Sequence, residues 1–164
     1  MNSIQTPANR PMTLTTEGDT HILVTRRFNA SPEAVYRAHT EPAIIQKWLL
    51  GPDGWTMPVC INENRPGGKF RYEWANGKGH SFHITGELVE LEPPRRIVHI
   101  ERMHLPDPTP DNHVETTFTP DGDGTLMTMR MTLPDAATRA QMLASGMEGG
   151  MEASYVRLEG LQLV

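Results

Sequence analysis

The chain has little of what marks secreted, membrane-spanning or nucleic-acid-binding proteins. Its 164 residues include one cysteine, Cys60, so no disulfide forms within the chain, which favours a reducing compartment. No run of eighteen apolar residues is present to span a bilayer, and the first residues lack the apolar core of a signal peptide. The net charge of −5 is spread over interspersed acidic and basic residues, which offers no basic patch for nucleic acid. We therefore expect a cytoplasmic protein with no nucleic-acid partner and no membrane span.

The signatures of common catalytic and metal centres are missing too. There is no Gly-x-Ser-x-Gly elbow, phosphate-binding loop or dinucleotide fingerprint, and Cys60 lacks an evident histidine partner, which favours an inert buried thiol. Seven histidines are present, but His80 and His83 lie three apart in a predicted strand and so face opposite sides. We expect no metal and no cofactor.

Length and composition define the domain. The chain is long enough for one domain with its own core. Residues 1–18 are rich in Pro, Asn, Thr and Gly and contain no apolar run, which predicts a mobile tail. Residues 19–164 then form a single domain.

Most of this domain is a series of predicted strands. Residues 21–28 form the first, and two short helices follow, one opened by Ser31 and Pro32 and one by Pro42 and closed by Gly51. Hairpin turns separate the later strand candidates, which are residues 55–62, 69–75, 80–91, 96–104, 113–119 and 125–133.

The last thirty residues predict one long helix. Its apolar stripe at steps of three and four consists of Ala136, Ala140, Leu143, Met147, Met151, Ser154, Leu158 and Leu161. Three glycines, Gly146, Gly149 and Gly150, interrupt the stripe, and each costs a helix about 1 kcal/mol relative to alanine. We interpret the segment as a helix lying over a cavity; the alternative is an ordinary packed helix that tolerates glycine.

The pattern as a whole predicts an α+β fold. The apolar faces of the strands need a cover, and the C-terminal helix is the remaining element long enough to provide it. We therefore expect a helix-grip arrangement: a curved antiparallel sheet of about six to seven strands around a long C-terminal helix, with two short helices after the first strand.

Aromatic and methionine residues are the main candidates for ligand binding. They come from separate segments that this fold brings around one volume, where they would form an adaptable apolar pocket or simply fill the core. The set is Trp48, Phe70, Tyr72, Trp74, Phe82, Met127, Met129, Met131, Met147, Met151 and Tyr155.

Several stretches together resemble the family of activator-of-heat-shock-protein-90-ATPase-like domains, within the START-like, or SRPBCC, superfamily. They include an acidic-x-Arg-x-Gly-Gly-x-aromatic motif at residues 63–70 and lie at 26–36, Trp48, 63–72, 92–98, 124–125 and 150–158. Two positions depart from the family pattern: Met151 stands where many relatives have tryptophan, and Glu101 where an aromatic is common. The resemblance implies a helix-grip fold, a hydrophobic cavity, frequent homodimers and usually no established catalysis.

The one polar pair with chemical interest is His99 and Glu101. They lie two apart in a predicted strand and so share a face with Ile97, whereas apolarity alone favours Val98 and Ile100 as the buried face. The family pattern turns His99 and Glu101 toward the cavity. There, apolar surroundings would shift their pKa values toward those useful for proton transfer or for holding a polar ligand group.

Three functions are consistent with this sequence. The first is binding of a small hydrophobic or amphipathic molecule between the C-terminal helix and the sheet. The second is an enzyme resembling polyketide cyclases and aromatases, with His99, Glu101 or Tyr155 moving protons. The third, implied by the family name, is interaction with a chaperone ATPase.

Overall fold

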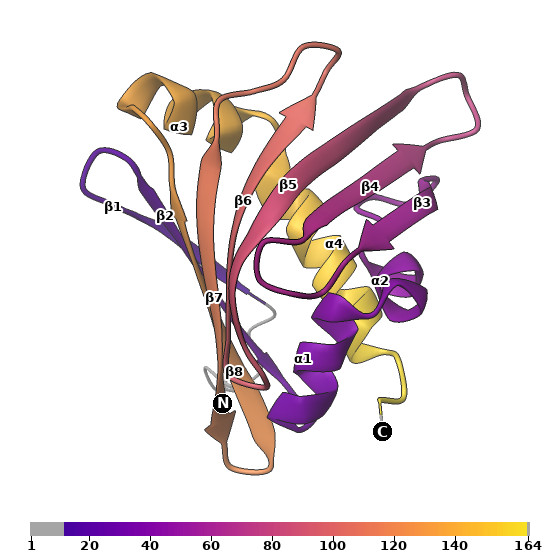
Figure 1. The fold of residues 1–164 in the computed structure, drawn as a ribbon, viewed down its shortest axis with the longest axis vertical. Helices are drawn as coiled ribbons and strands as arrows, with labels where there is room; N and C mark the ends of the chain where they lie inside the picture. The colour runs from indigo at the N-terminus through magenta and orange to yellow at the C-terminus, as the bar shows by residue number, and fades with distance from the viewer. Residues whose placement is uncertain (1–11, 164) are drawn as a thin grey trace, which may run out of the picture.

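A single antiparallel sheet curves around a helix that crosses its concave side (Figure 1). The computed structural model describes residues 12–163. Within that range the strands follow the order β1-β2-β8-β7-β6-β5-β4-β3, so β1 and β3 form the two edges. The elements are β1 (Thr13–Glu17), β2 (His21–Phe28), α1 (Pro32–Thr40), α2 (Pro42–Trp48), β3 (Thr56–Asn62), β4 (Lys69–Ala75), β5 (Ser81–Glu92), β6 (Arg96–His104), β7 (Asn112–Asp121), β8 (Gly124–Thr132), α3 (Ala136–Ala144) and α4 (Met147–Glu159). The predicted α+β helix-grip fold is confirmed, with eight strands in the sheet.

The two short helices begin where the sequence predicts. The Ser31 hydroxyl accepts a hydrogen bond from the Ala34 backbone N–H at 3.2 Å, and Pro32 occupies the first turn of α1. Pro42 does the same for α2, which ends at Trp48. Together they close one end of the space between the sheet and α4 (Figure 1).

The predicted tail is wrong for Thr13–Glu17. These residues form β1 and pair with β2, with Leu14 opposite Val24. Threonine is a good strand former, and the exposed edge of β2 supplies the hydrogen-bonding partner. Residues 1–11, the rest of the predicted tail, lie outside the described residues.

The predicted single C-terminal helix is also wrong, because the chain breaks into α3 and α4. Gly146 has a φ of 86°, a left-handed conformation that glycine adopts without steric cost and that ends the first helical segment. Asp135 opens α3 by accepting a hydrogen bond from the Thr138 backbone N–H at 2.8 Å. The first of the three glycines therefore separates two helices and does not bend one.

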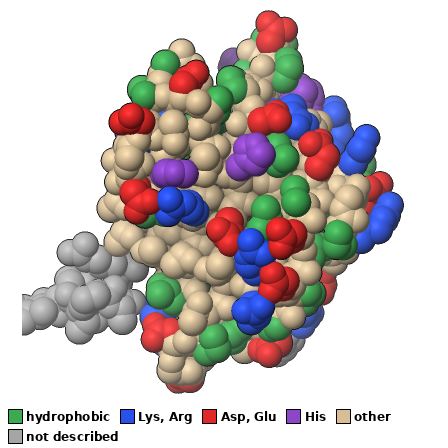
Figure 2. Space-filling view, turned by 60° about the vertical axis from the view of Figure 1, so that its left-hand side comes forward, with side chains coloured by type: hydrophobic (Ala, Val, Ile, Leu, Met, Phe, Trp, Pro, Cys, Tyr) green, Lys and Arg blue, Asp and Glu red, His purple; other side chains and the backbone are tan. Residues whose placement is uncertain are grey.

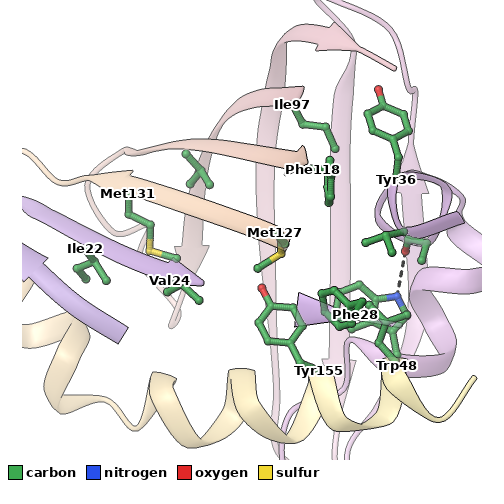
Figure 3. Packing of buried hydrophobic residues seen from close by; sticks show 14 of the residues in the cluster. Ile22, Val24, Phe28, Tyr36, Trp48, Ile97, Phe118, Met127, Met131 and Tyr155 are labelled. Carbon is green, nitrogen blue, oxygen red and sulfur yellow. Dashed lines mark hydrogen bonds between the residues drawn. The ribbon is translucent and has the colours of Figure 1, made fainter. Parts of the chain in front are cut away.

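The main core lies between the concave face and α4. Figure 3 shows Tyr155 rising from α4 toward Met127, beside Phe28 and Trp48. Buried members come from β2, α1, α2, β6, β7, β8, the residue after β8, and α4: Ile22, Val24, Phe28, Val35, Tyr36, Ala38, Trp48, Ile97, Val114, Phe118, Met127, Met131, Leu133, Tyr155 and Leu158. A second, smaller cluster lies under α2 and contains Ile45, Met57 and Trp74.

Ion pairs cover the outer surface. On the face shown in Figure 2, acidic and basic side chains are interspersed. Arg96, for example, contacts Glu90, Glu92 and Glu115 at 2.7, 2.8 and 2.6 Å. None of the helices within residues 12–163 combines the length and apolarity needed to cross a membrane.

Candidate functional site

Strand β6 turns His99 and Glu101 toward the concave side of the sheet. His99 pairs with the buried Val114 of β7, and Glu101 pairs with the buried Asn112. Directly paired residues of neighbouring strands lie on the same face. The face expected from the family pattern is therefore the inner one, and the choice of Val98 and Ile100 that apolarity alone favours is wrong.

The two side chains form a hydrogen-bonded pair against an aromatic wall. His99 Nε2 lies 2.7 Å from Glu101 Oε1, and the two side chains are 17% and 26% exposed. The Phe70 ring meets the His99 imidazole edge to face at 5.3 Å. Gly86 makes this possible, because a Cβ there would lie 2.4 Å from Phe70 Cζ and 2.1 Å from the Ile100 carbonyl oxygen. The His99–Glu101 pair is therefore partly exposed to solvent and lies against an apolar surface.

Asn112 is the most unusual residue beside this pair. It is 2% exposed, and neither its amide nitrogen nor its amide oxygen has a hydrogen-bond partner. Leaving a buried polar group unpaired costs about 1–3 kcal/mol, and native proteins contain few such groups. This unpaired amide lies directly opposite Glu101 in the β6–β7 pairing.

Two tyrosines flank Glu101 from different elements. Burial raises the pKa of Tyr72 on β4 and of Tyr155 on α4, and the negative charge of Glu101 raises both further. Both phenols therefore remain protonated donors at neutral pH. Among residues 12–163, nothing forms a hydrogen bond with the Tyr155 hydroxyl.

An ion pair between a buried arginine and a half-buried glutamate fixes the end of α4 to the sheet. Arg26 on β2 is 7% exposed and its Nη1 lies 3.0 Å from Glu159 Oε1, while Glu159 Oε2 accepts from the Asn29 backbone N–H at 3.1 Å. Removing one partner of a buried pair costs more than the pair itself contributes. This clamp sets the position from which Tyr155 enters the core.

The two tryptophans of the predicted pocket do not offer free polar groups. Trp48 Nε1 donates to the Ala38 carbonyl at 2.9 Å, and Trp74 Nε1 donates to the Leu49 carbonyl at 2.8 Å. Trp48 stacks on Tyr155 and Trp74 stacks on Phe82. Both indoles therefore anchor α2 and the segment after it.

The remaining members of the predicted set divide by burial. Met127 and Met131 are buried in the main core, and Met129 is half-buried beside them. Met147 and Met151 of α4 are half-buried, so the set does not line one volume evenly.

The half of α4 near α3 is packed less tightly than the other half. We call this region the open end; it comprises α3, which buries none of its residues, with Met147, Gly149 and Met151. A Cβ on Gly149 would meet nothing within 4 Å, so this glycine is not required by close packing. At the packed end, by contrast, Ser154, Tyr155 and Leu158 are each at most 3% exposed.

Cys60 and the histidines show no metal-binding arrangement. Burial raises the pKa of Cys60 to about 11, so its thiol stays protonated at neutral pH. His83 stacks on His104 at 4.3 Å, and His80 lies near the Asn76 side chain. Within the described range no three His, Cys, Asp or Glu side chains converge.

Two surface hollows lie away from the polar pair. One, of about 230 Å³, is bordered by α1, α2 and residues 161–163. The other, of about 290 Å³, lies over β2, β7 and β8 and is lined by Leu23, Thr25 and Thr128 among others. Neither contains His99, Glu101 or Asn112.

Asn112 and Arg26 are the site residues that sequence analysis missed. The predicted seventh strand began at His113 and so left out Asn112, which continues the inward phase of Val114. Arg26 shares the inward phase of Val24 and Phe28. In both cases the signal was a polar residue at a position where the alternation of the strand predicts a buried side chain.

The fold and the concave polar cluster define a helix-grip protein with a partly polar interior. The chain belongs to the family described as activator of Hsp90 ATPase homolog 1-like protein, whose model matches residues 29–162. No curated protein matches the chain.

Solved structures share the fold over most of the chain. A Rhodobacter sphaeroides protein shares 30% identity with a TM-score of 0.84, over 90% of this chain and 95% of that one. A Mycobacterium smegmatis protein shares 22% identity with a TM-score of 0.80, over 90% and 93% of the two chains. A Nitrosomonas europaea protein shares 21% identity with a TM-score of 0.76, over 87% and 94%. The last two likenesses concern the fold alone.

Proposed function

We propose that this protein binds a small amphipathic molecule between the open end of α4 and the concave face of the sheet. The apolar part of the ligand contacts the aromatic wall of β4 and the methionines of α4, while its polar part meets the cluster on β6 and β7. The protein acts by binding, without chemistry on the ligand.

One observation carries this proposal. A hydrogen-bonded His99–Glu101 pair and an unpaired buried amide, Asn112, lie together on an inner face that is otherwise apolar. Polar groups cost free energy in such a place unless something pairs with them. Ligand sites have this composition, with mostly apolar walls and a few convergent polar groups.

Native mass spectrometry of freshly purified protein tests the proposal. The wild-type protein is expected to carry a small molecule, or to take up 2-nonanone, an apolar ketone, when this is added. In the Met151→Trp variant a larger side chain occupies the open end, and binding should fall. Leu126→Trp places the same indole on the outer face, where Leu126 is 37% exposed, and should bind like the wild type. The proposal would be refuted if none of the three proteins carried a co-purified small molecule or bound 2-nonanone.

A second function is supported by the His99–Glu101 contact itself. An imidazole held by a carboxylate at 2.7 Å is an arrangement that serves general acid–base catalysis, as in a cyclase or aromatase acting on a polyketide-like substrate. If His99→Ala leaves every detected turnover unchanged, this mechanism is wrong.

Three further expectations remain predictions. Interaction with a chaperone ATPase is implied by the family's description and would be tested by co-purification. A homodimer would be tested by analytical ultracentrifugation. The cytoplasmic location rests on the single cysteine and would be tested by cell fractionation.

A further inference from the structure

We infer that the ligand's polar end is a neutral primary-amide-like group, which offers a hydrogen-bond acceptor and two N–H donors in one plane. This inference rests on the proposed function and specifies the chemistry of the same site. Carboxamides, carbamates and ureas belong to this class.

The first observation is that Asn112 presents two unpaired atoms of opposite character. Its Nδ2 donates and its Oδ1 accepts, and neither has a partner although the residue is 2% exposed. A group with a carbonyl oxygen next to an N–H pairs with both atoms at once. A ketone, ether or alkyl chain leaves at least one of them unpaired.

The second observation concerns the carboxylate of Glu101, directly opposite Asn112 in the β6–β7 pairing. Its Oε1 contacts His99 Nε2, whereas within residues 12–163 nothing donates to its Oε2. A primary amide has a second N–H that this oxygen can accept. An anionic head group would instead meet the negative charge of Glu101, which disfavours carboxylates and phosphates.

The third observation concerns Arg26, a buried arginine on the inner face that already has a carboxylate partner. Arg26 contacts Glu159 at 3.0 Å and lies over the Phe28 ring at 4.9 Å. The Glu159 carboxylate therefore balances the charge of Arg26, although the Arg26 Nε is buried without a hydrogen-bond partner. The surroundings of Asn112 favour a neutral ligand group.

The experiment compares three probes of similar size by titration calorimetry at pH 7.5. Octanamide has the proposed head group, 2-nonanone replaces its NH₂ with CH₃, and octanoate replaces it with O⁻. Octanamide should bind at least about tenfold more tightly than 2-nonanone, since it adds two hydrogen bonds. Octanoate should bind more weakly than octanamide. The Glu101→Gln variant should reduce this difference in affinity.

Variants of β7 separate the amide contact from general packing. Asn112→Leu removes both unpaired atoms, and Asn112→Asp replaces the donor with a second acceptor oxygen and adds a negative charge. In both, octanamide should lose its advantage over 2-nonanone. Thr116→Val is the matched control, because Thr116 is buried on the same face of the same strand. It should keep the advantage.

The outcomes distinguish this inference from the proposed function. If 2-nonanone binds but octanamide binds no more tightly, or if Asn112→Leu keeps the preference, the inference is wrong and ligand binding stands. If none of the probes binds the wild-type protein, both are wrong.

Discussion

The two ends of helix α4 have different relations to the sheet. At the packed end, Tyr155 inserts between Phe28 and Trp48, with ring centroids 5.6 and 5.8 Å away, and Leu158 is 1% exposed. At the open end, Met147 and Met151 are half-buried, and Gly149 adds no side chain.

This difference shows how one helix can serve both stability and binding. The packed end is fixed by the Arg26–Glu159 pair and by aromatic contacts that hold the helix in place. The open end does not need to supply that stability, so it tolerates Gly149 and the half-buried Met147 and Met151.

The largest expected effect is on stability when the packed end is truncated. Leu158→Ala should lower the free energy of unfolding by about 2–5 kcal/mol, because it removes fully buried methyl groups and leaves a cavity. Met151→Ala, at the open end, should cost about 1 kcal/mol or less, since Met151 is already half-exposed. Urea unfolding measures both values, and equal losses would remove the distinction between the two ends.

Acid should weaken the packed end through His39, which lies against Trp48 and Phe118. Burial lowers the pKa of His39 to about 4, partly offset by its contact with the Val35 carbonyl. Above pH 6.5 the imidazole is neutral in both states and has no effect. As pH falls from 6.5 to 4 the unfolded state takes up the proton first, so stability falls by about 3 kcal/mol.

The His39→Leu variant isolates this effect. Its unfolding free energy should fall less than that of the wild type between pH 7 and pH 4, and the difference between the two proteins cancels the contribution of the carboxylates. Parallel curves for the two proteins would show that His39 is not the source.

On the concave face of the sheet, removing the unpaired amide of Asn112 should stabilise the protein. Asn112→Leu replaces two unpaired buried atoms with methyl groups of similar shape and should raise the free energy of unfolding by about 1–3 kcal/mol. Thermal unfolding without ligand measures the change, with Thr116→Val for comparison. A loss of stability would mean that Asn112 has a structural partner.

The smallest effect is expected at Gly149. An alanine there meets nothing within 4 Å, so Gly149→Ala should stabilise the helix by up to about 1 kcal/mol. At Gly86 the same change should destabilise the protein, because the new Cβ would overlap Phe70 and the Ile100 carbonyl oxygen. Chemical unfolding of the two variants should give shifts of opposite sign.

Much of the fold could be predicted because local signals and burial agree along β4, β6 and the two short helices. The strands at Lys69–Ala75 and Arg96–His104 have the predicted bounds. Strand β1 was missed because its polar composition carries no apolar pattern, and its pairing depends on the edge of β2. The break at Gly146 was missed because the apolar stripe continues through it.

The site could be predicted only in part, since burial does not reveal which polar atoms are satisfied. Phe70 and Tyr72 were among the predicted pocket residues, and the family pattern placed Glu101 on the inner face. The occupied donors of Trp48 and Trp74, however, depend on carbonyls brought close only by folding. The unpaired amide of Asn112 likewise could not be predicted, because only the folded structure shows that neither of its amide atoms has a hydrogen-bond partner.

Methionine methyl NMR during an octanamide titration tests the central claim most directly, because methionines lie both at the open end, at Met147 and Met151, and away from it, at Met57. We expect shifts at Met147 and Met151 of the open end and at Met103 near the end of β6, with little change at Met57 under α2. Shifts confined to Met57, or none at a concentration that saturates binding, would contradict a binding site at the open end.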